Sequence, residues 1–219
     1  MPRASAPSES LSIIRSGPIR VLHQSANPPQ RPAVFLDRDG TLIEHVPYLD
    51  DPTRVRLLPS TGEALRRLAD AGFARVLVTN QSGIGRGRIT HECVEKIHWE
   101  VQSQLAEQGA SLDAVYYCPL VPSESDRTRL EHPDRKPGPG MLLRAARDLS
   151  LDLATSWMVG DLISDALAGH YARCRGSILV RTGIGNSCRD NLLCPGLRFC
   201  DDLLAAATLI VDDRAGRLS

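Results

Sequence analysis

The sequence lacks the features that mark several classes of protein. It carries no net charge, since 26 basic residues balance 26 acidic ones, and this balance argues against a general affinity for nucleic acids or anionic membranes. No apolar run is long enough to cross a membrane, and no hydrophobic signal core follows Met1. The six cysteines are scattered rather than closely spaced, which favours reduced thiols over a disulfide scaffold. We therefore expect a soluble protein of the cytoplasm.

Length and composition indicate one folded domain preceded by an extension. A chain of 219 residues can bury a sizeable core, and its 42% apolar and 24% charged residues are ordinary for a globular protein. Residues 1–32 contain six prolines, six serines and a single acid, Glu9, which is typical of a flexible extension. Within it, Ile19–Leu22 could dock as a short edge segment. We expect the domain to span residues 33–219 and to be a monomer.

Strand and helix signals alternate from residue 33 onward. Short apolar runs bounded by turn residues predict strands, and apolar residues at helical spacing behind capping residues predict helices. The expected strands span residues 33–36, 73–79, 113–117, 156–160 and 177–180, with a last short one near Leu197. The expected helices run from a capping box at 60–63 to Gly72, from Thr90 to Gly109, from Pro139 to Leu149, from Ala166 to Ala172, and from about Asp201 onward. This order predicts a doubly wound α/β fold, a three-layer sandwich whose mainly parallel sheet has its first strand near the centre.

The first strand runs directly into two acids, in the stretch Asp37-Arg38-Asp39-Gly40-Thr41. Residues i and i+2 of an extended segment point to the same side, so Asp37 and Asp39 are expected to face one site while Arg38 faces away. Gly40 permits a sharp turn that leaves both carboxylates at the carboxyl end of the strand, where open α/β sheets bind their ligands. Such a pair suits a hard cation such as Mg²⁺, or a carboxylate nucleophile that accepts phosphate. A surface turn with two solvated acids is the alternative.

Three further polar clusters also follow expected strands. Thr79-Asn80-Gln81-Ser82-Gly83 offers a hydroxyl, amides and backbone N–H groups for phosphate oxygens, or is an ordinary polar turn. Arg135-Lys136-Pro137 supplies fixed positive charge for phosphate, or is a solvated basic pair. In the stretch 160–165, Asp161 and Asp165 could complete a cation site, although Asp165 could equally cap the next helix.

In this order, and each at a strand end, the four clusters resemble the haloacid dehalogenase superfamily of phosphotransferases. The resemblance covers residues 33–185. Three longer stretches, at 78–87, 116–119 and 135–141, resemble more narrowly its histidinol-phosphatase and heptose-bisphosphate-phosphatase branch, with the greater likeness to the heptose-bisphosphate enzymes. The loop Leu42–Pro59 and the insertion before Pro137 are too short for a folded cap domain, so a capless member is expected.

The resemblance implies a magnesium-dependent phosphatase that forms an aspartyl-phosphate. Asp37 would be the nucleophile, and Asp39 the general acid and then the general base. Asp37, the backbone carbonyl of Asp39, and Asp161 would hold Mg²⁺. Asp165 would orient Lys136 or a metal-bound water. The remaining implied residues contact the phosphate or the rest of the substrate: Thr79, Asn80, Gln81, Ser82, Arg86, Arg135 and Lys136.

The chain departs from that branch at its zinc-binding loop. Relatives commonly carry a Cys-x-His pair followed later by Cys-x-Cys just before Arg-Lys-Pro. Here Cys118 is present, but Leu120 replaces the histidine, and His132 and Asp134 stand where the two cysteines belong. A structural zinc site needs four well-placed ligands, so we expect no zinc requirement.

The resemblance implies a phosphorylated small molecule, most naturally the 7-phosphate of D-glycero-D-manno-heptose 1,7-bisphosphate, as the substrate. Histidinol phosphate and nucleic-acid 3′ ends are the alternatives within the enzyme class, and the balanced charge disfavours the second. A phosphate-binding regulatory module without catalysis is the alternative outside it. The presence of Asp37, Asp39, Lys136 and Asp161 together favours an enzyme.

Overall fold

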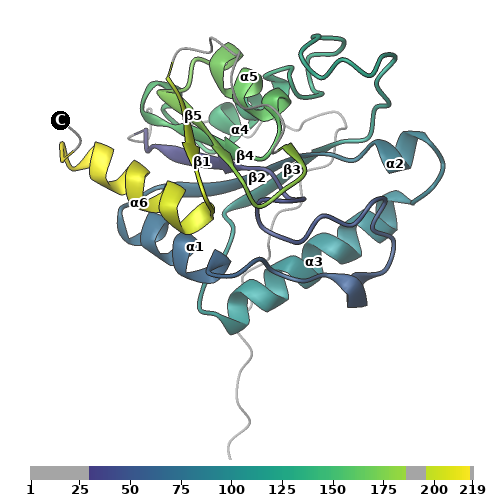
Figure 1. Cartoon of the computed structure of the whole chain (residues 1–219), viewed down its shortest axis with the longest axis horizontal. Coiled ribbons are helices and arrows are strands. Elements are labelled where there is room, and N and C mark those ends of the chain that lie inside the picture. Colours follow the sequence, from purple (N-terminus) through teal and green to yellow (C-terminus); the bar gives the residue numbers. More distant parts are fainter. Residues whose placement is uncertain (1–29, 186–195, 218–219) are drawn as a thin grey trace, which may run out of the picture.

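In the computed structural model, which describes residues 30–185 and 196–217, strand β1 (Ala33–Leu36) lies inside a six-stranded sheet (Figure 1). The strand order is β3-β2-β1-β4-β5-β6, and every neighbouring pair is parallel. The other strands are β2 (Ala74–Asn80), β3 (Ala114–Cys118), β4 (Trp157–Gly160), β5 (Gly176–Val180) and β6 (Leu197–Cys200). The predicted parallel sheet with an inner first strand is confirmed.

Helices cover both faces of this sheet, which confirms the predicted three-layer sandwich (Figure 1). They are α1 (Thr61–Asp70), α2 (Ser82–Gly85), α3 (His91–Glu107), α4 (Gly140–Asp148), α5 (Ile163–Tyr171) and α6 (Leu203–Arg214), with 3₁₀ turns η1 (Pro52–Arg54) and η2 (Leu153–Thr155). Side chains of a strand alternate between faces, so Val34 and Leu36 pack in the core with α1, α3 and α6. Ala33 and Phe35 pack in the opposite core with α4 and α5.

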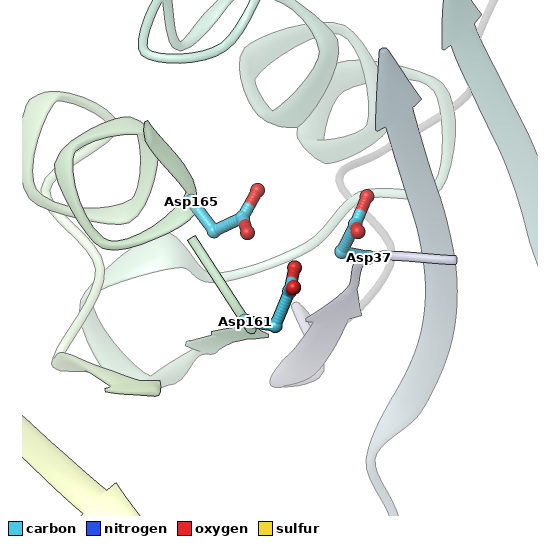
Figure 2. A group of neighbouring side chains, drawn as sticks. All are labelled: Asp37, Asp161 and Asp165. Atoms are coloured by element: carbon cyan, nitrogen blue, oxygen red, sulfur yellow. The ribbon is translucent and has the colours of Figure 1, made fainter. Parts of the chain in front are cut away.

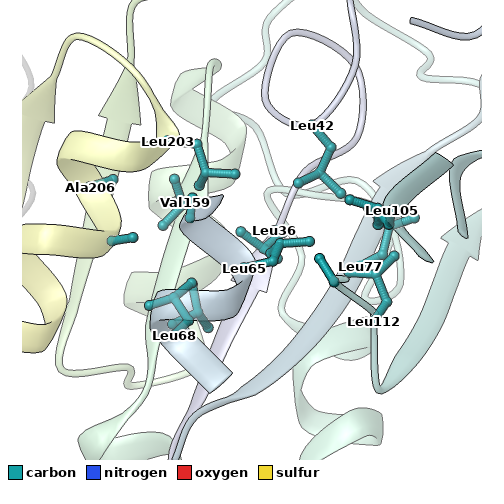
Figure 3. Close-up of a cluster of buried hydrophobic side chains, with 14 of the residues drawn as sticks. Leu36, Leu42, Leu65, Leu68, Leu77, Leu105, Leu112, Val159, Leu203 and Ala206 are labelled. Carbon is teal, nitrogen blue, oxygen red and sulfur yellow. The ribbon is translucent and has the colours of Figure 1, made fainter. Parts of the chain in front are cut away.

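The larger core surrounds the end of β1 (Figure 3). Leu36 is fully buried there with Leu65 of α1 and Leu77 of β2. Full burial of one such side chain contributes roughly 1.5–3 kcal/mol. Because Leu36 immediately precedes Asp37, this packing fixes the point at which the first acid leaves the strand.

Three local expectations differ from the structure. Ser60 precedes α1 as expected, but it has a left-handed φ of 61° and its side chain makes no capping hydrogen bond, so the predicted capping box is absent. No helix was expected between the strand at 73–79 and the helix from Thr90, but the short helix α2 spans Ser82–Gly85. Helix α5 begins three residues before the predicted Ala166, because the Asp165 carboxylate accepts a hydrogen bond from the Leu162 N–H at 3.0 Å and caps this earlier start.

The predicted extension falls mainly outside the described residues, as does the docking segment Ile19–Leu22, and the boundary at residue 32 stays a prediction. Arg31 is already in contact with the domain, since its guanidinium pairs with Asp113 at 3.0 Å and its carbonyl accepts the Asp152 N–H. In the part of the chain that the structure describes, no helix is long and apolar enough to span a membrane.

Candidate active site

Three acids from two neighbouring strand ends converge on one point (Figure 2). Asp37 follows β1, Asp161 follows β4, and Asp165 lies in the first turn of α5. One carboxylate oxygen from each lies within 4.8 Å of the other two. The chain leaves β1 toward β2 on one side and returns to β4 on the other, so the acids occupy the switch point of the sheet, where such folds bind ligands.

Lys136 lies against the same acids. Its ammonium group is 2.6 Å from Asp37 Oδ1 and 2.7 Å from Asp165 Oδ1, and it donates to the Val78 carbonyl at 2.8 Å. The side chain is buried, so its charge is not screened by solvent. The predicted Lys136 is therefore a fixed cation beside the predicted nucleophile.

A short segment after β5 packs directly on Asp161. The Ile184 N–H donates to Asp161 Oδ2 at 2.9 Å, and the Thr182 hydroxyl donates to the Gly40 carbonyl at 2.7 Å. A Cβ atom at Gly183 would lie 2.0 Å from Asp161 Oδ2, and one at Gly185 would lie 1.6 Å from the Asp161 carbonyl oxygen. This segment was not among the predicted site residues, although its two glycines, two residues apart and just beyond a strand end, were a visible signal.

Burial makes the negative charge of two of these acids, Asp37 and Asp161, unfavourable. Burial raises the pKa of Asp37 to about 7, and Lys136 opposes this rise while Asp165 adds to it. Burial and then Asp165 raise the pKa of Asp161 to about 6. Although burial opposes its charge, Asp165 and Asp37 raise the pKa of Lys136 above its usual value. One ammonium group thus faces more negative charge than it can balance.

This arrangement fits a divalent cation bound by oxygen. The Asp161 Oδ1 atom is buried and has no hydrogen-bond partner among the described residues, although its carboxylate is otherwise well held. Carboxylate oxygens are the preferred ligands of Mg²⁺. Within residues 30–185 and 196–217, no other three His, Cys, Asp or Glu side chains approach one another so closely. The predicted ligands Asp37, Asp161 and Asp165 are thus brought together.

Asp39 is not one of the three closely spaced acids. Its carboxylate accepts from Arg38 Nε and Nη2, both at 3.2 Å, and from Gln81 Nε2 at 3.1 Å. The expectation that Arg38 faces away from the site is therefore wrong, because its guanidinium binds Asp39 and lines the same cavity. The alternation of an extended strand ends with β1 at Leu36, and the Leu42 N–H already bonds back to the Arg38 carbonyl. The assigned contact of Asp39 with a metal, through its backbone carbonyl, stays a prediction.

The residues at the end of β2 and directly after it support one another. The Asn80 side chain accepts from the Lys136 N–H at 3.1 Å and donates to the Lys136 carbonyl at 3.0 Å, so it fixes the backbone that carries the ammonium group. The buried Thr79 hydroxyl accepts from Gln81 Nε2 at 2.9 Å. Ser82 begins α2 and lines the cavity described next. Whether these groups contact phosphate stays a prediction.

A cavity of about 720 Å³ opens above Asp39 and Lys136. The predicted Arg86 and Arg135 both line it, together with Arg127, which the sequence analysis did not identify. Burial lowers the pKa of Arg135, and the nearby Arg86 and Arg127 lower it further. Guanidinium groups that repel one another around a cavity form a site for an anion.

The loop between Cys118 and Lys136 is held by polar contacts. The Glu131 carboxylate accepts from the backbone N–H groups of Ser123 and Glu124, at 2.8 and 2.9 Å. Asp134 pairs with Arg144 of α4 at 2.6 Å. The absence of a zinc requirement stays a prediction, but Asp134, one of the substituted ligand positions, already has a cationic partner.

Comparison with known proteins agrees with this geometry. A family model described as HAD-hydrolase-like matches residues 134–206. The D-glycero-beta-D-manno-heptose-1,7-bisphosphate 7-phosphatase of Yersinia pestis is 43% identical over 153 residues, which cover 69% of this chain and 81% of the relative.

Two solved structures have the same fold. One is a D,D-heptose 1,7-bisphosphate phosphatase from B. bronchiseptica complexed with magnesium and phosphate, with 33% identity and a TM-score of 0.72 over 84% of this chain and 99% of that one. The other is the corresponding phosphatase from Burkholderia thailandensis, with 30% identity and a TM-score of 0.62 over 83% and 99%. With its acids, lysine and parallel sheet in place, the chain belongs to the haloacid dehalogenase-like phosphatases, in the branch of the heptose-bisphosphate phosphatases.

Proposed function

We propose that this chain is a magnesium-dependent phosphatase that removes the 7-phosphate of D-glycero-D-manno-heptose 1,7-bisphosphate. The observation that carries the proposal is the buried cluster of Asp37, Lys136 and Asp161 at the sheet edge, in a chain that shares 43% identity with phosphatases of that name. The cavity of about 720 Å³ beside the cluster lies in the size range of small-ligand sites.

The residues divide the reaction into two displacements. Asp37 attacks phosphorus and forms an aspartyl-phosphate, while Asp39 protonates the departing alkoxide. Asp39 then deprotonates the water that attacks the intermediate, and this step releases inorganic phosphate and regenerates Asp37. Lys136, held at Asp37 in the resting site, balances charge on the nucleophile and on the transferred phosphoryl group. Thr79 and Asn80 are the remaining groups assigned to the phosphoryl oxygens.

The metal fits the carboxylates of the same cluster. Asp37 and Asp161 would hold Mg²⁺, with Asp165 beside them. When bound, the ion supplies positive charge between the nucleophile and the phosphate, which otherwise repel each other.

Three arginines support a second phosphate on the substrate. Arg86 and Arg127 line the same cavity as Arg135, and both lower the pKa of Arg135, whereas Cys118 and Glu131 raise it. The guanidinium of Arg135 donates to the Leu120 carbonyl at 2.8 Å, which fixes its position. An anionic group placed among them relieves this repulsion, so a bisphosphate should bind better than a monophosphate.

A substrate comparison tests the proposal. Wild-type protein with Mg²⁺ should hydrolyse the heptose bisphosphate with a higher kcat/KM than histidinol phosphate or a 3′-phosphorylated oligonucleotide. Asp37→Asn should abolish turnover of all three. Bisphosphate binding without turnover by the wild-type protein would instead indicate a regulatory module, and a preference for histidinol phosphate would overturn the substrate assignment.

The arginines can be tested within the same assay. Arg127→Gln should raise KM for the bisphosphate about tenfold, in the range expected for loss of one charge-assisted hydrogen bond, and leave a sugar monophosphate unaffected. Arg129→Gln is a matched control, because Arg129 lines the cavity but pairs with Glu124. Equal effects of both substitutions on both substrates would argue against a second phosphate site.

A further inference from the structure

A buried group of polar side chains behind Asp39 has no part in the mechanism above. It consists of His98 on α3, Arg38 in the first acidic stretch, and Gln81 after β2. The side chain of Arg38 is only 2% exposed. A guanidinium cannot lose its charge, so burying one is unfavourable unless its partners compensate fully.

Each nitrogen of the Arg38 guanidinium has a defined partner. Nε donates to Asp39 Oδ2 and Nη2 donates to Asp39 Oδ1, both at 3.2 Å, which is the two-pronged geometry that only arginine offers. Nη2 also donates to Gln81 Oε1 at 3.0 Å, and Nη1 lies 3.3 Å from His98 Nε2. Gln81 closes the ring with its own bond to Asp39 at 3.1 Å.

His98 contributes one acceptor to this group. Arginine only donates, so His98 Nε2 must be unprotonated where it meets Arg38, and the ring proton is on Nδ1. Burial and the adjacent Arg38 charge hold the pKa of His98 well below its usual value, in agreement with a neutral ring. Nδ1 is buried and has no hydrogen-bond partner in the described part of the chain. An unpaired buried donor is unfavourable, so the advantage of histidine at this place lies in its contact with Arg38.

We propose that Arg38 is a positioning residue for Asp39, and that His98 and Gln81 hold Arg38 in place for that task. The inference rests on the proposed proton transfers by Asp39. In the first half-reaction a proton leaves Asp39 for the alkoxide, and in the second Asp39 removes one from the attacking water. Both steps require the carboxylate at a fixed place, and a displacement of about 1 Å can cost 10²-fold in rate.

Substitutions at His98 separate positioning from packing. His98→Leu keeps an apolar body and removes the acceptor, and we expect kcat for a sugar phosphate to fall at least about tenfold with little change in KM. His98→Gln places an amide oxygen near the former Nε2 and should restore kcat to within about threefold of wild type. Arg38→Lys keeps the charge but cannot bridge three partners. Its kcat should therefore fall as much as that of His98→Leu.

The stage at which the reaction stalls provides the sharper readout. p-Nitrophenolate leaves without needing a proton, so p-nitrophenyl phosphate should still phosphorylate Asp37 in the variants. Hydrolysis of the aspartyl-phosphate still needs Asp39. We therefore expect His98→Leu and Arg38→Lys to release a rapid burst of p-nitrophenolate, with phosphate trapped on the protein after an acid quench, as Asp39→Asn should.

Arg75→Lys is the matched control, because Arg75 forms another largely buried pair, with Asp113 at 2.7 Å, at the opposite end of β2. This control variant should lower the melting temperature and give no burst.

Wild-type kinetics in both His98→Leu and Arg38→Lys would overturn the proposal, as would a raised KM at constant kcat, which indicates direct substrate binding. If the wild type and Asp39→Asn show the expected kinetics but these variants do not, only this inference fails. If the wild type hydrolyses no phosphate ester, the proposed function itself fails.

Discussion

Asp161 illustrates, at the scale of one residue, how a site suited to a cation weakens the protein that contains it. Burial raises the pKa of this acid to about 6, with a further contribution from Asp165. At neutral pH the carboxylate is still mostly charged, so the folded protein carries the cost of burying this charge when no metal ion is bound. The same buried charge that costs stability is the one that attracts Mg²⁺.

Asp161→Asn should accordingly stabilise the metal-free protein. We expect a gain of about 1 kcal/mol, which corresponds to roughly 2–4 °C in melting temperature for a chain of this size. The same variant should bind Mg²⁺ much more weakly and lose most of its activity. Calorimetry in EDTA, followed by a Mg²⁺ titration, measures both effects.

Asp113→Asn is the matched comparison for this prediction. Burial alone would raise the pKa of Asp113, but the hydrogen bonds and charge of Arg75 outweigh burial and lower this pKa. Asp113 is therefore stabilised in its charged form. Its substitution should lower the melting temperature. If Asp161→Asn also destabilised the metal-free protein, the description of Asp161 as an unfavourable charge would be wrong.

At the scale of an element, the loop from Cys118 to Lys136 determines where Arg135 and Lys136 lie. Relatives were expected to brace it with zinc, whereas here the Glu131 carboxylate binds two backbone N–H groups and Asp134 binds Arg144. The prolines at 119, 122, 133 and 137 restrict the backbone further. The loop thus has a source of rigidity that does not depend on a metal.

We predict that metal analysis of the purified protein finds well under one zinc per chain, and that a zinc chelator leaves cleavage by trypsin at Arg127 and Arg129 unchanged. Glu131→Ala should speed that cleavage about threefold or more, because the loop opens more often. Glu107→Ala, an exposed acid at the end of α3, should have no effect. One tightly bound zinc ligated through Cys118 would contradict this account.

The whole molecule should respond to Mg²⁺ in a manner that depends on pH. Without metal, the pKa values of Asp37 and Asp161 are about 7 and about 6, above the ordinary value of 3.8. A group whose pKa is raised by folding contributes stability that is complete below pH 3.8 and is lost as the pH rises through the folded value. Stability of the metal-free protein should therefore fall between about pH 4 and pH 7, before other groups are considered.

Saturating Mg²⁺ should recover this loss. We expect the Mg²⁺-induced rise in melting temperature to be small at pH 5, where protons compete for the carboxylates, and to grow by several degrees by pH 8. Thermal scans with Mg²⁺ and with EDTA across this range provide the test, and Asp161→Asn should flatten the dependence. A metal effect that was larger in acid would refute the assigned pKa values.

The sequence predicted the sheet and the convergence of its acids because each signal was local. Apolar runs gave the strands, and Asp37 and Asp161 each stand immediately beyond one. Arg38 was misplaced because the alternation of an extended strand was applied past Leu36, where the chain already turns. Arg127 and His98 could not have been identified, since only the folded chain brings them to the cavity and to Arg38.

The segment Thr182–Gly185 shows a requirement that functional groups alone do not reveal. At positions 183 and 185 the backbone lies where any added carbon would overlap Asp161. The site therefore depends on two residues whose contribution is the lack of a side chain. They are as much a part of the active site as its acids are. A search for catalytic residues that considers only reactive atoms will pass over such positions. A redesign that replaces either glycine with a larger residue will displace the Asp161 carboxylate that they enclose.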